Sequence, residues 1–78
     1  MQAVSFPQIM QILALTDEMD ISREAVDIPL TPESPGAVRR LPNGKLEIVV
    51  DADMPFEEWL KGLAPTIHEL MNEQDEGH

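Results

Sequence analysis

The fold is decided by residues 37–51, which read AVRRLPNGKLEIVVD. This stretch predicts a β-hairpin, because two runs of strand-forming residues flank the turn signal Asn43-Gly44. Asn and Gly tolerate the positive φ angles that tight hairpin turns require. On the second strand every second residue from Leu46 onward is apolar, so one face should lie on a hydrophobic core. Val49 falls on the opposite face, which we therefore expect to be partly covered.

A helix is predicted to follow the hairpin, from an N-cap at Asp53 to about residue 72. Pro55 suits its first turn, where backbone amides have no helical partner. Gly62 and Pro65 interrupt the helical pattern, and Pro65 predicts a kink or a break because proline has no amide to donate. A continuous apolar stripe, bordered by Trp59, is formed by Phe56, Leu60, Leu63, Ala64, Ile67, Leu70 and Met71.

An earlier helix is predicted to begin after Ser5, which forms a capping-box pattern with Gln8. Its apolar residues recur at helical spacing, and it should end around residues 17–20. The face that we expect to be buried consists of Phe6, Ile9, Met10, Leu13 and, less regularly, Ile12.

The segment between this helix and the hairpin is predicted to be extended over residues 21–30 and a loop over residues 31–36. Pro29 lacks an amide and would confine any strand here to a sheet edge. Two prolines and a glycine within the loop exclude a regular ladder.

Together these elements predict an α+β fold with an N-terminal helix, a short antiparallel sheet built on the hairpin, and a C-terminal helix packed on the sheet. A chain of 78 residues forms one domain, which we place at residues 1–72, followed by an acidic disordered tail at residues 73–78. The predicted core consists of Ile9, Leu13, Leu46, Ile48, Val50, Leu60, Leu63 and Ile67.

The charge of the chain limits the kinds of partner that it can bind. It carries 15 acidic residues against 5 basic ones, for a formal net charge of −10. This balance argues against nucleic acid and anionic membranes, which are bound through Lys and Arg. It favours a basic partner protein or a bound cation. No run of about 20 apolar residues predicts a membrane span. With no cysteine and no signal-peptide pattern, we interpret the chain as cytoplasmic.

One motif points to metal chemistry. Zinc peptidases place two histidines four residues apart on one helical face, with a glutamate after the first to activate the metal-bound water. Residues 66–72, which read TIHELMN, supply His68 and Glu69 but have Asn72 in place of the second histidine.

The arrangement resembles the ImmA/IrrE-type metallopeptidases, in which a strand ending in Asn precedes a helix with His-Glu-x-x-His. The corresponding stretches are LEIVVD at residues 46–51 and LAPTIHEL at residues 63–70. The resemblance extends over most of residues 9–72. It implies a mixed α+β unit with the catalytic helix on the sheet, a first zinc ligand at His68 and a general base at Glu69.

The chain departs from that family where the metal would bind. Asn72 is a poor zinc ligand, Pro65 lies within a turn of the motif, and the sequence ends at His78, before the position at which the family's downstream acidic ligand would be expected. We therefore expect a non-catalytic interaction or regulatory module that resembles a degenerate peptidase unit and has no cofactor. Two alternatives remain open: a minimal zinc metallopeptidase that uses His68 and Glu69, and an acidic protein that mimics nucleic acid.

Two further groups of residues are candidates for binding. The acids Asp51, Asp53, Glu57 and Glu58 cluster around the start of the second helix, where helix capping already explains them. The predicted partner surface consists of Trp59, Glu69 and Asn72, and a homodimer seam over uncovered apolar residues is an alternative use of such a surface.

Overall fold

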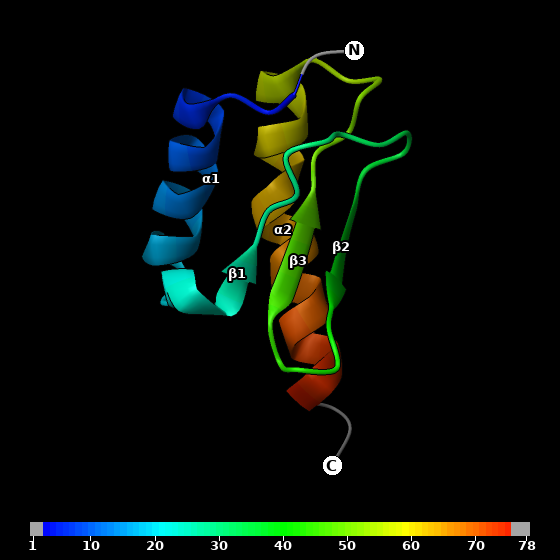
Figure 1. Ribbon diagram of the computed structural model, residues 1–78. Helices are drawn as coiled ribbons and strands as arrows, with labels where there is room; N and C mark the ends of the chain where they lie inside the picture. Colours follow the sequence, from blue (N-terminus) through cyan, green and yellow to red (C-terminus); the bar gives the residue numbers. More distant parts are fainter. Residues whose placement is uncertain (1–2, 76–78) are drawn as a thin grey trace.

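The computed structural model describes residues 3–75, and of residues 73–75 the backbone only. A small sheet lies in front of one helix and beside another (Figure 1). The elements are the helix α1 (Phe6–Glu18), the 3-10 helix η1 (Arg23–Ala25), the strands β1 (Val26–Asp27), β2 (Ala37–Arg40) and β3 (Leu46–Val49), and the helix α2 (Phe56–Asp75). The predicted α+β class is thereby confirmed.

The sheet has the order β1-β3-β2, so β3 lies in the centre. The predicted hairpin pairs β2 with β3 in antiparallel register, Val38 opposite Ile48 and Arg40 opposite Leu46. β1 joins the other side of β3 in parallel. The sheet is therefore mixed and not purely antiparallel as predicted. Its parallel pair joins β3 to a segment about twenty residues earlier in the chain.

The hairpin turn lies at Asn43-Gly44, as predicted. The amide of Gly44 donates to the carbonyl of Leu41 at 2.9 Å, and the amide of Lys45 donates to the Asn43 side chain at 2.9 Å. Gly44 has a φ of 88°. This combination is typical of a three-residue hairpin loop in which glycine takes the left-handed position.

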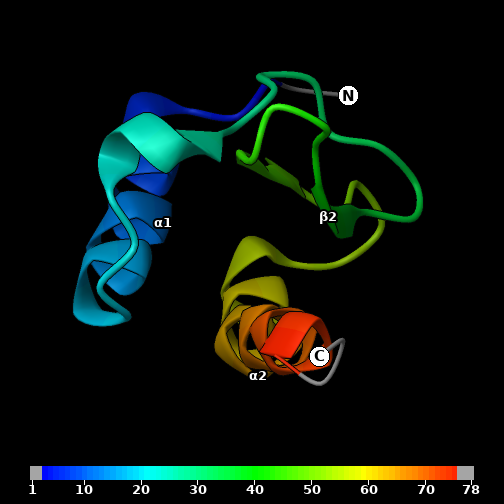
Figure 2. The same ribbon diagram turned by 90° about the horizontal axis from the view of Figure 1, so that it is seen from below.

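The core lies where α1, α2 and one face of the sheet converge. Its buried members are Val4, Ile12, Leu46, Ile48, Val50, Trp59, Leu63 and Ile67. Of the predicted core, Leu60 and Ile9 pack against this cluster but are only partly buried, while Leu13 lies outside it. Val49 is buried on the opposite face of β3, which confirms that this face is covered. In Figure 2, α2 lies on one side of the sheet and the connection from β1 to β2 on the other.

The buried face of α1 differs from the prediction. The capping box at Ser5 and Gln8 is present, and the helix ends at Glu18 as expected. However, Ile12 and Thr16 are its fully buried residues, whereas Phe6 is 72% exposed. The helix accommodates Thr16 in the core because its hydroxyl donates to the carbonyl of Leu13 at 3.0 Å.

α2 is longer and more continuous than predicted. It runs through Pro65 without a break and continues to Asp75, three residues past the expected end. Lys61, whose carbonyl loses a partner at Pro65, lies on the exposed side of the helix, where water can hydrate that carbonyl. Residues 76–78 of the predicted tail lie outside the described residues.

Candidate functional site

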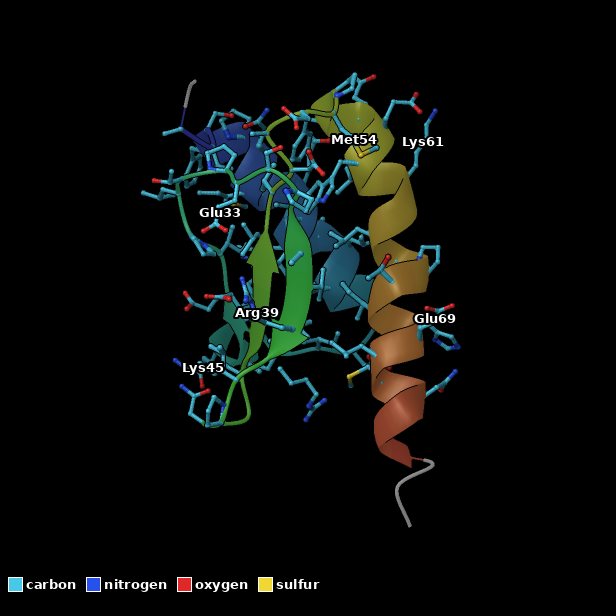
Figure 3. All side chains as sticks on the ribbon, turned by 90° about the vertical axis from the view of Figure 1, so that its right-hand side faces the viewer. Glu33, Arg39, Lys45, Met54, Lys61 and Glu69 are labelled. Carbon is cyan, nitrogen blue, oxygen red and sulfur yellow. The ribbon has the colours of Figure 1, made fainter. Side chains whose placement is uncertain are left out.

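The residues of the zinc-peptidase motif lie on the outer face of α2. Ile67 is fully buried, but the adjacent His68 and Glu69 are exposed, and so is Asn72 one turn further on. Figure 3 shows Glu69 pointing away from the sheet. Among the residues that the structure describes, no three His, Cys, Asp or Glu side chains are grouped so that they could hold a metal ion.

Trp59 lies in the core and not at the exposed border of α2 that the sequence predicts. Its side chain is only 9% exposed. The indole ring packs against Phe56, with 5.6 Å between ring centroids and a tilt of 40°. Of the predicted partner surface, only Glu69 and Asn72 are therefore exposed.

Asp51 organises the connection from β3 to α2. Its carboxylate accepts hydrogen bonds from the amide of Asp53 at 2.7 Å and from the amide of Gly36 at 3.1 Å. These amides, Asp53 first and then Gly36, hold the pKa of the Asp51 carboxyl below its ordinary value, against the opposing effect of partial burial. Asp51 is thus a structural anion that ties the β1–β2 connection to the end of β3.

Asp53 does not cap α2, contrary to the prediction. The helix begins only at Phe56, directly after Pro55, and the Asp53 carboxylate instead accepts a hydrogen bond from the Ser34 hydroxyl. Glu57 and Glu58 do occupy the first turn of α2, where negative charge is favoured.

No acidic side chain within residues 3–72 is buried: Glu47 and Asp51 are half-buried, and the others are exposed. Three of the five bases are neutralised locally. The ion pairs within residues 3–72 are Arg23–Asp17 at 2.9 Å, Arg39–Glu47 at 2.7 Å and Lys61–Glu58 at 3.8 Å. Most acids of the described surface are left without an opposite charge.

The charges are also separated along the sheet. Three of the five bases, Arg39, Arg40 and Lys45, lie on the hairpin near its turn. Acids gather at the other end, around the start of α2. In Figure 3, Arg39 and Lys45 lie near the turn, while Glu33 lies nearer the opposite end of the sheet.

A groove of about 250 Å³ lies between β2 and α2. Apolar side chains line it, together with Gly62, which has no atom within 4 Å of the position where a Cβ would be built. Asp51 and Glu58 contribute acidic groups to the same groove. The remaining lining residues are Gly36, Ala37, Val38, Met54, Trp59, Leu63 and Thr66.

β2 forms the wall of this groove and is an edge strand. The amide of Leu41 bonds to the carbonyl of Lys45 at 2.8 Å, which makes Leu41 a hydrogen-bonded position of the antiparallel ladder. Hydrogen-bonded and non-bonded positions alternate along such a ladder. The amides and carbonyls of Val38 and Arg40 therefore point outward, away from β3.

This groove was not predicted from the sequence. Gly62 was the one residue that could have indicated it. A glycine at an exposed helical position lowers helix stability, so its presence there suggests a packing or binding role. No local pattern indicated Gly36, whose contact with Asp51 joins segments 15 residues apart.

Comparison of the chain with protein-family models, curated proteins and solved structures gives no match. The resemblance to the ImmA/IrrE-type peptidases therefore stays a prediction. No helix within residues 3–75 combines the length and the apolar character needed to cross a membrane.

Proposed function

We propose that this chain is a non-catalytic interaction module that binds a basic segment of a partner protein. The observation that carries the proposal is the surplus of exposed, unpaired carboxylates on the described surface. Complementary charge steers such partners together and selects among them.

The acids around the start of α2 are the part of this surface best suited to binding. Glu57 and Glu58 are exposed. Glu58 borders the groove between β2 and α2, and its one ion pair, with Lys61 at 3.8 Å, is long and exposed to solvent. Charge beside an apolar groove offers a partner both electrostatic attraction and burial of an apolar side chain. The exposed acids of α1 and η1 do not line this groove.

We do not propose the zinc-peptidase alternative. A catalytic zinc site ordinarily combines three protein ligands with an open position. His68 and Glu69 are exposed on the side of α2 away from the sheet, and Asn72 follows them on the helix. No observation on the described residues favours this alternative.

Affinity capture on the immobilised chain, followed by calorimetry with the purified captured protein, tests the proposal. We expect a basic partner whose affinity falls markedly between about 0.05 M and about 0.5 M salt, because screening weakens exposed charge pairs. A partner without excess positive charge, or binding indifferent to salt, would contradict it.

A matched pair of variants locates the charge that matters. Changing Glu57 and Glu58 together to Gln should weaken binding of the captured partner. Changing Glu18 and Glu24 together to Gln removes the same charge from exposed positions on α1 and η1 and should weaken it less. Competition by duplex DNA for the same partner would instead favour the nucleic-acid mimic.

A further inference from the structure

We propose that an extended segment of the partner adds to the open edge of β2 as an antiparallel strand, places an apolar side chain in the groove against α2, and presents a Lys or Arg to Asp51 and Glu58. This inference rests on the proposed function and names its binding mode. Strand addition supplies affinity through main-chain hydrogen bonds, and pockets beside the strand supply specificity.

The backbone of β2 is set up for such an addition. The outward amides and carbonyls of Val38 and Arg40 offer two donors and two acceptors to an incoming strand. No other strand borders this edge within residues 3–75. Figure 3 looks directly at β2, with α2 beside it.

The side chains beside this edge suit a peptide residue that points toward α2. The Val38 side chain shares the face of Ile48 and packs against the core. A peptide residue paired with Val38 would point to the same side and enter the groove. Gly62 leaves the opposite wall of the groove open, because it has no side chain there.

The charges define the direction and chemistry of the peptide. β2 runs from Ala37, near Asp51, to Arg40, whose guanidinium donates to the Met71 sulfur at 3.3 Å. An antiparallel peptide therefore begins near Arg40 and ends near the acids. Complementarity places a basic residue on the C-terminal side of its apolar residue.

A second copy of the chain fits this edge less well, because two chains that each carry a net charge of −10 repel each other. Self-pairing of β2 centred on Arg39 or on Arg40 sets an arginine directly opposite its own copy, and like charges in that position are destabilising. Charged residues on an edge strand commonly discourage such self-association. The occupant that the charges favour is a different, basic protein.

Selection of a displayed library of random peptides on the full chain tests the chemistry of the occupant. Peptides of about ten residues are long enough, since a strand advances roughly 3.3 Å per residue. We expect the selected peptides to share an apolar residue followed, toward the C-terminus, by Lys or Arg. Selected peptides without this order of residues would overturn the proposal.

Two matched pairs of variants test the site itself. Both Arg40→Pro and Arg40→Gln remove the guanidinium with its charge and its contact to Met71, but only Arg40→Pro also removes the outward amide. The proline variant should therefore bind a selected peptide about tenfold more weakly than the glutamine variant. Gly62→Leu fills the groove and should abolish binding. Ala14→Leu adds the same side chain at an exposed position on α1 and should leave binding unchanged.

The Gly62 pair keeps the test decisive if Arg40→Pro fails to fold, because leucine favours the helix and a Cβ at residue 62 meets no atom within 4 Å. Equal binding by Gly62→Leu and Ala14→Leu would overturn the strand-addition site. If the captured partner still binds these variants in a salt-dependent way, the proposed function stands and only its location is wrong.

Discussion

Gly36 lies so close to the end of β3 that its amide donates a hydrogen bond to the Asp51 carboxylate, with 3.1 Å between the nitrogen and Oδ2. A Cβ atom at residue 36 would lie 2.6 Å from the backbone nitrogen of Asp51 and 2.6 Å from the carbonyl oxygen of Val49. Backbone atoms of a central strand cannot move aside as a flexible side chain would. This contact fixes the β1–β2 connection beside the edge strand and the groove.

Gly36→Ala should therefore destabilise the domain. We expect a loss of about 1–3 kcal/mol in the free energy of unfolding, the usual cost of forcing an extra methyl into a packed site. Gly62→Ala is the matched control, because its Cβ meets no atom within 4 Å and alanine is the better helix former by about 1 kcal/mol. Urea unfolding of both variants should show opposite signs, and equal effects would contradict the close approach at Gly36.

The Asp51 carboxylate should make stability depend on acidity. Because hydrogen bonds from the Asp53 and Gly36 amides lower its pKa in the folded state, its contribution is complete above the ordinary aspartate pKa of about 4 and is lost as the pH falls through the lower folded value. The difference in unfolding free energy between the parent and Asp51→Asn should shrink as the solution is acidified below about pH 4. A difference that stays constant or grows in acid would show that the carboxylate is not held in this way.

The buried face of α1 can be tested directly. Ile12 is fully buried and Phe6 is 72% exposed. Ile12→Ala should cost about 2–5 kcal/mol, whereas Phe6→Ala should change the free energy of unfolding by no more than about 0.5 kcal/mol. Thermal or urea unfolding of the two variants distinguishes the face observed in the structure from the face that the sequence pattern predicts. If the predicted face were buried, Phe6→Ala would cost more than Ile12→Ala.

Zinc titration tests the metallopeptidase alternative. We expect no stoichiometric binding at neutral pH, because His68 is exposed and has Asn72, not a second histidine, one turn further along α2. One-to-one binding at about micromolar affinity, abolished by His68→Ala, would revive the peptidase. Asn72→His is the companion variant: the family resemblance predicts that it creates measurable zinc affinity, and an inert variant would remove most of the support for that resemblance.

Sequence patterns predicted the structure correctly where it depends only on neighbouring residues in the chain. The hairpin followed from Asn43-Gly44 and from the alternation that begins at Leu46. Most of the buried face of α2 followed from its continuous apolar stripe, although Trp59 is buried and Met71 is exposed. α1 is apolar over most of its turns, so its sequence does not distinguish one face from the next. Tertiary packing chose the face with Ile12 and Thr16.

Other features depend on residues far apart in the chain. Asp53 is a suitable N-cap by residue type, but the Ser34 hydroxyl engages its carboxylate. No turn signal in the sequence predicts the parallel pairing of β1 with β3. The groove arises only when β2 is laid beside α2, and the open edge of β2 follows from the order of the strands. Neither the groove nor the open edge could be obtained from one segment at a time.

Amide hydrogen exchange at Val38 and Arg40 is the most direct test of the central claim, that this chain binds a basic partner along the edge of β2. In the free chain these outward amides should exchange fast, while Arg39, which bonds into the ladder with β3, should exchange slowly. A selected peptide or the captured basic partner should slow exchange at Val38 and Arg40 and leave Arg39 slow. A saturated complex in which Val38 and Arg40 exchange as fast as in the free chain would contradict the account.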